Sequence, residues 1–225
     1  MEHATFKRAI LYVAGLLLFT AVMGFATSDS CTFARMYMSV NNQTDGDHTY
    51  QAIHVSPYNP MKNCTDTELV ASIQNGYTGY IYLGSPRCPY CRNTVPLLLE
   101  QAQASGISRI LSCTLQNYNY RFEYTDVGLI ETQHGTPAYD TLLQLLDAYT
   151  APKRIAAPGG QAVDTGVRTI YMPAVLHCTN GVPDRCWQYS STGITLDAGQ
   201  SAYDSWTPAQ QQLARESLQE FFAEQ

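Results

Sequence analysis

From residue 65 onwards, apolar and polar positions alternate with the periods of strands and helices. Residues 80–83, Tyr-Ile-Tyr-Leu, form an aromatic and β-branched run that Gly84 ends, which predicts a buried strand. Residues 97–103 follow a helical pattern, and residues 107–115 predict a second core strand. Because a strand, a helix and a strand follow one another, the two strands are expected to pair in parallel through a right-handed crossover.

Capping and turn residues place the remaining elements. Thr65 and Glu68 form a capping-box pair, so a short helix is expected over residues 66–74. The other expected elements are a helix from Thr136-Pro137, a Pro/Gly-rich loop over residues 151–166, a strand over residues 174–177, a turn at Asn180-Gly181, a return strand over residues 186–189 and a helix from Thr207-Pro208. This order predicts an α/β fold with a central mixed sheet flanked by helices.

The N-terminal segment over residues 1–26 has a different pattern. Lys7-Arg8 precede an uncharged apolar run that contains the small residues Gly24 and Ala26. This pattern is typical of an export signal, and a length close to the roughly 20 residues that span a bilayer leaves two readings open, a signal peptide or a membrane anchor. Because the positive residues come first, the remainder is expected to be extracytoplasmic, either membrane-anchored by this segment or secreted.

The organisation of the rest is simpler. Residues 27–64 lack a sustained period and are expected to form an extension or tether to one domain over residues 65–225. The chain has a formal net charge of −6, and its longest basic run is Lys7-Arg8, so no nucleic-acid partner is expected. Seven cysteines in an exported chain imply disulfides with one cysteine left over.

The candidate chemistry lies where the first predicted strand meets the following helix, at Cys88-Pro89-Tyr90-Cys91. The unpaired N–H groups and the positive end of a helix stabilise a thiolate, and Arg87 adds a full positive charge. Such settings lower a thiol pKa from about 8.5 into the range of roughly 3.5 to 7.5. Cys88 is therefore the expected nucleophile, and Cys91 is the expected resolving thiol that attacks a mixed disulfide and releases the product.

Two cysteines at this spacing are also half of a zinc site. A four-cysteine site would add Cys178 and Cys186 to the pair. However, Pro89 and Arg87 suit a thiolate turn, and the expected compartment is oxidising. Neither a metal nor a cofactor is therefore expected.

The other cysteines have a structural interpretation. Cys178 and Cys186 flank the predicted hairpin turn symmetrically, which predicts a cross-strand disulfide. Cys31 and Cys64 are expected to staple the N-terminal extension. Cys113 then remains on a core strand as a small buried hydrophobic residue.

The chain resembles the thioredoxin-like superfamily over roughly residues 66–225. The matching pieces are IYLGSPRCPYC at residues 81–91, Pro96 after the second cysteine, and GVRTIYMPAVLHCTNG at residues 166–181. The exported layout is most similar to bacterial thioredoxin-like proteins known as bacteriocin-transport accessory proteins. The resemblance implies a thioredoxin-like fold in which Met172-Pro173 is a cis peptide that faces the two cysteines, with an enlarged helical and loop segment before that strand.

The function that the resemblance implies is an extracytoplasmic thiol-disulfide oxidoreductase. Its partners would be cysteine-containing exported proteins or peptides and a membrane redox partner. Residues expected to bind the client or support the site are Arg87, Pro89, Tyr90, Met172 and Pro173. Oxidase, isomerase and reductase all stay open, because small environmental changes move reduction potentials across that range.

Two features bear on this expectation. Cytosolic thioredoxins carry a buried acid on the strand six positions before the first cysteine, whereas this chain has Tyr82 there, so the group that assists proton transfer is missing or replaced. The alternative function is a binding module that holds a client against Met172-Pro173 without exchanging disulfides. The intact cysteine pair argues against that alternative, since low-pKa exposed thiols are typical of functional sites.

Overall fold

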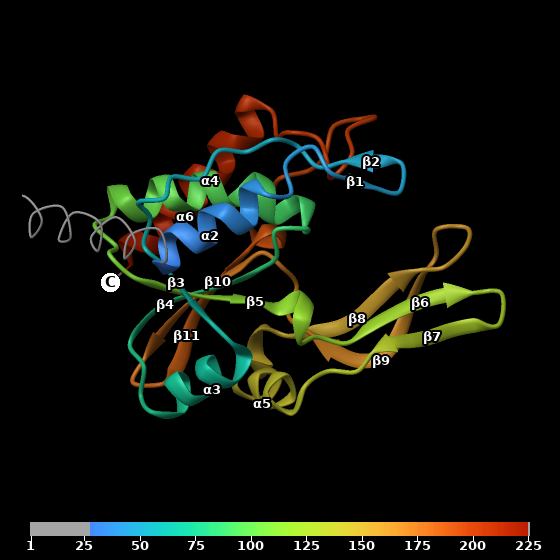
Figure 1. Ribbon diagram of the computed structural model, residues 1–225, viewed down its shortest axis with the longest axis horizontal. Coiled ribbons are helices and arrows are strands. Elements are labelled where there is room, and N and C mark those ends of the chain that lie inside the picture. The colour runs from blue at the N-terminus through green and yellow to red at the C-terminus, as the bar shows by residue number, and fades with distance from the viewer. Residues whose placement is uncertain (1–27, 225) are drawn as a thin grey trace, which may run out of the picture.

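Strand β4 (Gly79–Gly84) is the centre of a five-stranded sheet with the order β11-β10-β4-β5-β3 in the computed structural model, which describes residues 28–224 (Figure 1). The other four strands are β3 (Met61–Cys64), β5 (Ile110–Thr114), β10 (Ala174–Thr179) and β11 (Val182–Gln188). Strands β3 and β5 are parallel to each other and β5 is parallel to β4, while β10 is antiparallel to β4 and to β11. The sheet is therefore mixed, and the predicted parallel pairing of β4 with β5 is confirmed.

Helices cover both faces of this sheet (Figure 1). The first face packs against α2 (Asp29–Met38), α4 (Pro89–Ala104) and α6 (Pro208–Ala223), and the second against α3 (Asp66–Gln74) and α5 (Pro137–Leu145). Along β4, Tyr80 and Tyr82 face the first layer, and Ile81 and Leu83 face the second. This alternation follows from the two-residue period of a strand, and it produces two hydrophobic cores, one on each side of the sheet.

The helices start where the capping residues predict. Thr65 accepts from the backbone N–H of Glu68, whose side chain accepts from the Thr65 N–H in return, and α3 spans Asp66–Gln74 as expected. Thr136 caps α5, and Thr207 caps α6, each with proline at the next position. Local side-chain to backbone hydrogen bonds therefore set these boundaries.

The expectation that residues 27–64 form an extension or tether is wrong for the described part of that segment. Helix α2 buries Phe33, Ala34 and Tyr37 in the first core, and β3 forms the edge of the sheet beside β5. The Asn63 side chain donates to the Asp29 carbonyl oxygen at 3.0 Å, which ties β3 to the start of α2. Ile53 and Val55 lie outside any strand, and Val55 is buried in the first core.

The expected signal peptide or membrane anchor over residues 1–26 lies outside the described residues. Of the helices that residues 28–224 form, none has both the length and the apolar character that crossing a membrane requires.

Three hairpins extend from the sheet instead of the expected loops. They are β1 (Thr44–Asp45) with β2 (His48–Thr49), β6 (Arg121–Thr125) with β7 (Gly128–Gln133), and β8 (Ala151–Ala156) with β9 (Ala162–Thr169). The predicted loop over residues 151–166 is thus mostly a hairpin, with Gly159 and Gly160 at positive φ in its tip and Gly166 at positive φ in β9. Figure 1 shows the three hairpins at the same end of the molecule.

Candidate functional site

The turn between β4 and α4 places Cys88 at the N-terminus of the helix. Cys88 is the N-cap of α4, and its Sγ accepts a hydrogen bond from the backbone N–H of Cys91 at 3.3 Å. Pro89 occupies the start of the helix, where a missing N–H costs no hydrogen bond. Cys88 is partly exposed, whereas Cys91 is fully buried. The predicted position of the first cysteine at a helix start is confirmed.

The surroundings of Cys88 favour its thiolate. The Cys91 thiol donates to Cys88 and is the largest cause of the lowered pKa of Cys88, and the backbone N–H groups of Cys91 and Tyr90 lower it further against the effect of burial. The sequence predicts a contribution from Arg87, but its exposed side chain donates to Gln43 Oε1 at 3.0 Å instead. The helix end and the second cysteine, rather than Arg87, therefore lower this pKa.

The surroundings of Cys91 have the opposite effect. Burial raises the pKa of Cys91 well above its usual value, and the neighbouring Cys88 raises it further. Hydrogen bonds from the Tyr82 hydroxyl and the Ser85 backbone lower it in part. Of the two thiols, Cys88 therefore loses its proton first, and Cys91 keeps its own.

The loop before β10 lies directly against this pair. Its Met172–Pro173 peptide bond is cis, as the resemblance implies. The Cys88 thiol donates to the Met172 carbonyl oxygen over 3.8 Å. Tyr90 packs on Tyr189, with ring centroids 4.4 Å apart. The structure thus brings the Met172–Pro173 loop against Cys88 and Tyr90, although this loop lies more than 80 positions further along the chain.

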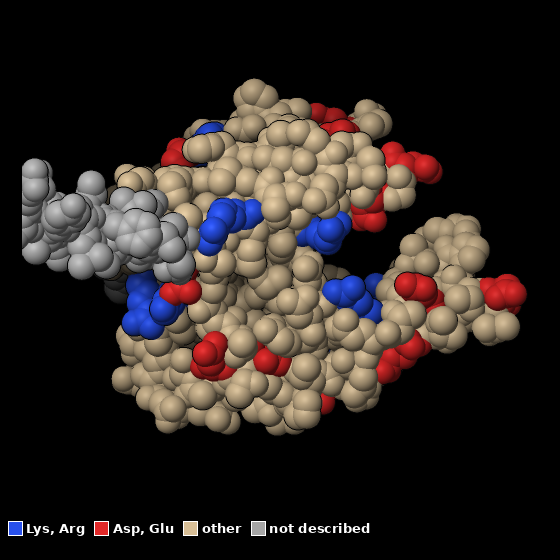
Figure 2. Space-filling view, in the orientation of Figure 1, with Lys and Arg blue, Asp and Glu red and all other residues tan. Residues whose placement is uncertain are grey.

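A cavity of about 600 Å³ opens beside Cys88. Asp45 from the β1–β2 hairpin, Arg87 from the turn and Arg121 at the start of β6 all line it. Figure 2 shows Lys and Arg side chains on both sides of the hollow at this end of the molecule. Two hairpins that are distant in sequence therefore flank one reactive thiol.

Arg92 holds the N-terminal segment against α4. It is fully buried and directly follows the second cysteine. Its guanidinium donates to the backbone carbonyls of Tyr37 at 2.9 Å, Gln51 at 2.7 Å and Pro86 at 3.1 Å, and to the Asn41 side chain. All these acceptors are neutral, so carbonyl dipoles stabilise the charge together with the Tyr50 ring, whose centroid lies 5.7 Å from the guanidinium carbon. One side chain thereby joins three separate segments.

Sequence reasoning missed both Arg92 and Tyr37. The apolar positions Phe33, Ala34 and Tyr37 lie at helical spacing, which is the signal that predicts a helix over this segment. The sequence offers no comparable signal for Arg92, because an arginine on a helix is usually exposed.

The predicted disulfides are not formed, because all seven cysteines are free thiols. In the β10–β11 hairpin, Cys186 pairs with Leu176, while Cys178 pairs with Pro183. The two-residue turn at Asn180-Gly181 fixes this register, which places Cys178 opposite Pro183, three positions before Cys186, so the two cysteines are not cross-strand partners.

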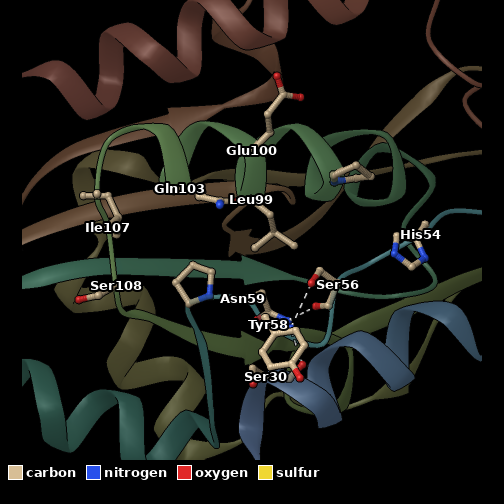
Figure 3. Close-up of a pocket in the computed structure, with 13 residues that line it drawn as sticks. Ser30, His54, Ser56, Tyr58, Asn59, Leu99, Glu100, Gln103, Ile107 and Ser108 are labelled. Atoms are coloured by element: carbon tan, nitrogen blue, oxygen red, sulfur yellow. Dashed lines mark hydrogen bonds between the residues drawn. The ribbon is translucent and has the colours of Figure 1, made fainter.

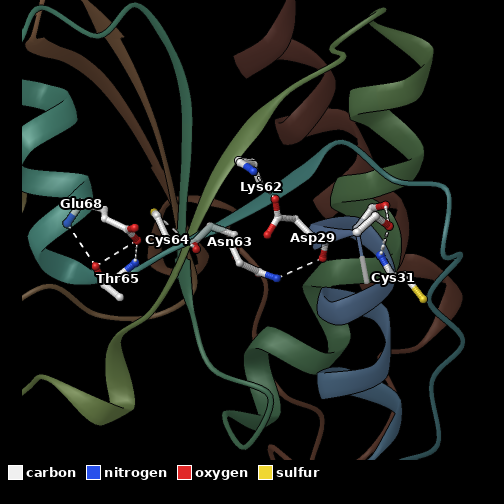
Figure 4. Close-up of polar contacts among 10 residues, drawn as sticks. Asp29, Cys31, Lys62, Asn63, Cys64, Thr65 and Glu68 are labelled. Carbon is white, nitrogen blue, oxygen red and sulfur yellow. Dashed lines mark hydrogen bonds and ion pairs between the residues drawn. The ribbon is translucent and has the colours of Figure 1, made fainter. Parts of the chain in front are cut away.

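The positions of the cysteines also argue against the predicted Cys31–Cys64 disulfide and the alternative zinc site. Figure 4 shows Cys31 on α2 and Cys64 at the end of β3 with their side chains pointing away from each other. Cys178 and Cys186 pack in the second core, whereas Cys91 lies in the first, so the sheet separates the four cysteines of the alternative zinc site. Within residues 28–224, no group of three metal-ligating side chains is placed to hold a metal ion.

A second cavity of about 720 Å³ runs along the far half of α4. Figure 3 shows Leu99 and Gln103 on one side and Tyr58 and Asn59 on the other. Leu99 is 11 residues beyond Cys88, which corresponds to about 16 Å along a helix. This larger cavity is therefore separate from the thiol pair, whose Cys88 lines the smaller one.

No protein-family model, curated protein or solved structure matches the chain. The candidate site is consequently defined by its own geometry, namely an N-cap thiol with a buried thiol behind it, a cis-proline loop in contact with it and a polar cavity beside it.

Proposed function

We propose that the protein is a thiol-disulfide oxidoreductase with a thioredoxin-like fold, which exchanges disulfides with client proteins through Cys88 and Cys91. One observation carries the proposal: Cys88 is the partly exposed N-cap of α4 and has a lowered pKa, whereas Cys91, one turn further, is fully buried and has a raised pKa. A structural cysteine gains nothing from such a difference, whereas an attacking and a resolving thiol need it.

The exchange has two steps. The Cys88 thiolate attacks a client disulfide and forms a mixed disulfide, and one client sulfur leaves as a thiolate. Cys91 then attacks Cys88 Sγ, which forms the Cys88–Cys91 disulfide and releases the second client sulfur. The reverse sequence oxidises a client dithiol. The cavity beside Cys88, which Met172, Arg87 and Arg121 also line, gives a client segment access to the sulfur.

We place this exchange outside the cytoplasm, on the basis of the export pattern in residues 1–26. The clients would be cysteine-containing exported proteins or peptides, with a membrane redox partner to restore the pair. The reduction potential of the Cys88/Cys91 couple decides its direction. A value near about −120 mV identifies an oxidase, and a value near about −270 mV identifies a reductase.

Trapping tests the proposal. In the Cys91→Ser variant the mixed disulfide cannot be resolved, so client adducts should accumulate, and they should disappear when Cys88 is also replaced. Insulin reduction and oxidation of a dithiol peptide measure turnover of the unmutated protein. If no adducts form and neither activity is present, the domain is the non-catalytic client-binding module instead.

A further inference from the structure

We propose that the hydroxyls of Tyr82 and Tyr37 form a hydrogen-bonded pair beneath Cys91 that stabilises the Cys91 thiolate in the resolving step, in place of a buried carboxylate. The inference rests on the proposed function and names the group that serves its second step. Tyr82 contacts the reacting sulfur and is the catalytic residue of the pair, whereas Tyr37 acts through Tyr82 and is a positioning residue.

The geometry of the pair is that of a continuous chain. The two hydroxyl oxygens are 2.7 Å apart, and both tyrosine side chains are 1% exposed. Tyr82 packs in the same core as Cys91, where its hydroxyl lowers the pKa of the Cys91 thiol, and the Cys91 N–H donates to Cys88 Sγ at 3.3 Å. Tyr37, Tyr82, Cys91 and Cys88 therefore lie in series, with the partly exposed Cys88 at the outer end.

The backbone makes room for this hydroxyl. A Cβ at Gly84 would lie 2.1 Å from the Tyr82 Oη and 2.3 Å from its Cζ. The phenol ring thus lies along the strand against a residue that has no side chain. Only glycine at position 84 leaves the Tyr82 hydroxyl in its place beneath Cys91.

No acid is available for the same task. The only buried carboxylate among residues 28–224 is that of Asp66, which bonds to Thr67 and Thr136 near the start of α3. That helix covers the second face of the sheet, whereas Cys91 lies at the first. The hydroxyl pair is therefore the group positioned to stabilise charge on Cys91.

The role of the tyrosines in the resolving step is to donate hydrogen bonds. When Cys91 attacks, its sulfur forms a bond to Cys88 Sγ, and the bond from Cys88 Sγ to the client sulfur breaks. The client sulfur leaves with the electron pair and takes up a proton, which balances the proton lost by Cys91. The cysteine pair is oxidised by two electrons and the client is reduced. The tyrosines retain their protons and lower the cost of the Cys91 thiolate by donating to it.

The test measures the resolving step alone. The reduced full-length protein is mixed with 5,5′-dithiobis(2-nitrobenzoic acid), and release of the coloured thiolate is followed by stopped flow. Cys88 releases the first equivalent, and Cys91 releases the second, which the Cys91→Ser variant lacks. We expect Tyr82→Phe to slow the second phase by about 10- to 100-fold, as loss of a hydrogen bond to a charged group implies, and Tyr37→Phe to slow it less. The first phase should change little.

Tyr80→Phe is the matched control. Tyr80 lies on the same strand and in the same core as Tyr82, and its buried hydroxyl has no hydrogen-bond partner among the described residues. Its loss should change the second phase by less than about twofold. Titration of the [β-¹³C]Cys91 NMR signal in a Cys88→Ala background gives a readout without turnover. The midpoint of this titration should move to higher pH in Tyr82→Phe and stay unchanged in Tyr80→Phe.

Two outcomes separate this inference from the proposed function. If Tyr82→Phe and Tyr80→Phe give the same second phase and the same Cys91 titration, the hydroxyl pair has no role, whatever the clients do. If the tyrosine effects appear but the unmutated protein neither traps nor turns over clients, the hydroxyl pair stands and the proposed oxidoreductase function fails.

Discussion

Cys88 and Cys91 are three residues apart, yet the fold gives them opposite properties. Cys88 ends an extended segment and receives N–H groups of the first helical turn, so negative charge on its sulfur is stabilised. Cys91 lies one turn further, inside the core between α4 and the sheet, where charge is costly. A single helix start therefore separates an attacking thiol from a protected one.

The dependence of Cys88 on Cys91 gives the first prediction. Because the Cys91 thiol is the largest cause of the lowered Cys88 pKa, Cys91→Ala should raise that pKa. A thiolate forms as pH rises through its pKa, so alkylation of Cys88 by iodoacetamide should reach half of its maximal rate at a higher pH. Cys91→Ser keeps a donor and should shift the profile less. Equal profiles for the two variants would contradict this account of Cys88.

A second prediction concerns Gly84. An alanine there must push the Tyr82 ring away, so Gly84→Ala should slow the second phase of thiolate release and cost about 1–3 kcal/mol of unfolding free energy. Gly135→Ala is the control, since its Cβ would lie 2.5 Å from the Tyr120 ring, away from the site. It should destabilise the protein in chemical denaturation without slowing resolution. A Gly84→Ala protein that resolves at the normal rate would show that the position of the Tyr82 hydroxyl is unimportant.

At the scale of elements, the sequence predicts what local interactions determine. Capping pairs such as Thr65 with Glu68 and Thr207 with Gln210 set helix boundaries through neighbours three residues away, and both were predicted from the chain. The cysteine turn and the cis Met172–Pro173 bond were predicted as well, through short motifs.

Elements that depend on distant partners were not predicted. Strand β3 has four residues and exists through pairing with β5, about 50 positions later. Strands β8 and β9 alternate between partly buried and exposed residues, and β8 contains a proline. Their sequence is therefore typical of a loop, and only their pairing with each other makes them strands. The Cys178–Cys186 disulfide was wrong because the two-residue turn at Asn180-Gly181 sets a register that pairs Cys178 with Pro183 and, after a bulge, Cys186 with Leu176. Tyr37 and Arg92 are part of the site through the same kind of distant contact.

The hydrogen bonds by which Arg92 joins three segments, here called the arginine clamp, give a prediction at this scale. Arg92→Met leaves the buried carbonyls of Tyr37, Gln51 and Pro86 without their donor, so we expect a loss of about 3–5 kcal/mol of unfolding free energy. Arg87→Met, in the same turn but exposed, should cost less than about 0.5 kcal/mol. Urea denaturation measures both. A similar small loss for the two variants would mean that the N-terminal segment does not depend on this clamp.

The β6–β7 hairpin gives another prediction. Arg121 and Gln133 are paired across its base, so residues 122–132 can be replaced by an Asn-Gly turn. Its strands are mostly exposed, and the stability should change by less than about 1 kcal/mol. Because the hairpin begins at the cavity beside Cys88, trapping of protein clients by the Cys91→Ser variant should fall, while the reaction of Cys88 with a small disulfide should not. Replacing the remote tip over residues 157–161 in the same way is the control, and equal trapping by both deletions would show that β6–β7 does not contact clients.

Across the whole molecule, the sheet separates two populations of cysteine. The reactive pair is on the face covered by α2, α4 and α6, where the hydroxyl pair and the arginine clamp also lie. Cys64, Cys113, Cys178 and Cys186 are on the opposite face, under α3 and α5. The sheet therefore lies between this second group and Cys88, although every one of these cysteines is a free thiol.

The separation predicts the order in which the thiols react. Burial raises the pKa of Cys64, Cys178 and Cys186 to about 12 each, so they are almost entirely protonated at pH 8, whereas the lowered pKa of Cys88 favours its thiolate. Since the thiolate is the species that is alkylated, brief treatment of the native protein with iodoacetamide at pH 8 should modify Cys88 well before these three. Mass spectrometry of the peptides identifies the modified sites, and treatment in denaturant, where all the thiols should react, is the control. Modification of Cys64, Cys178 or Cys186 as fast as Cys88 would contradict the division of the thiols by the sheet.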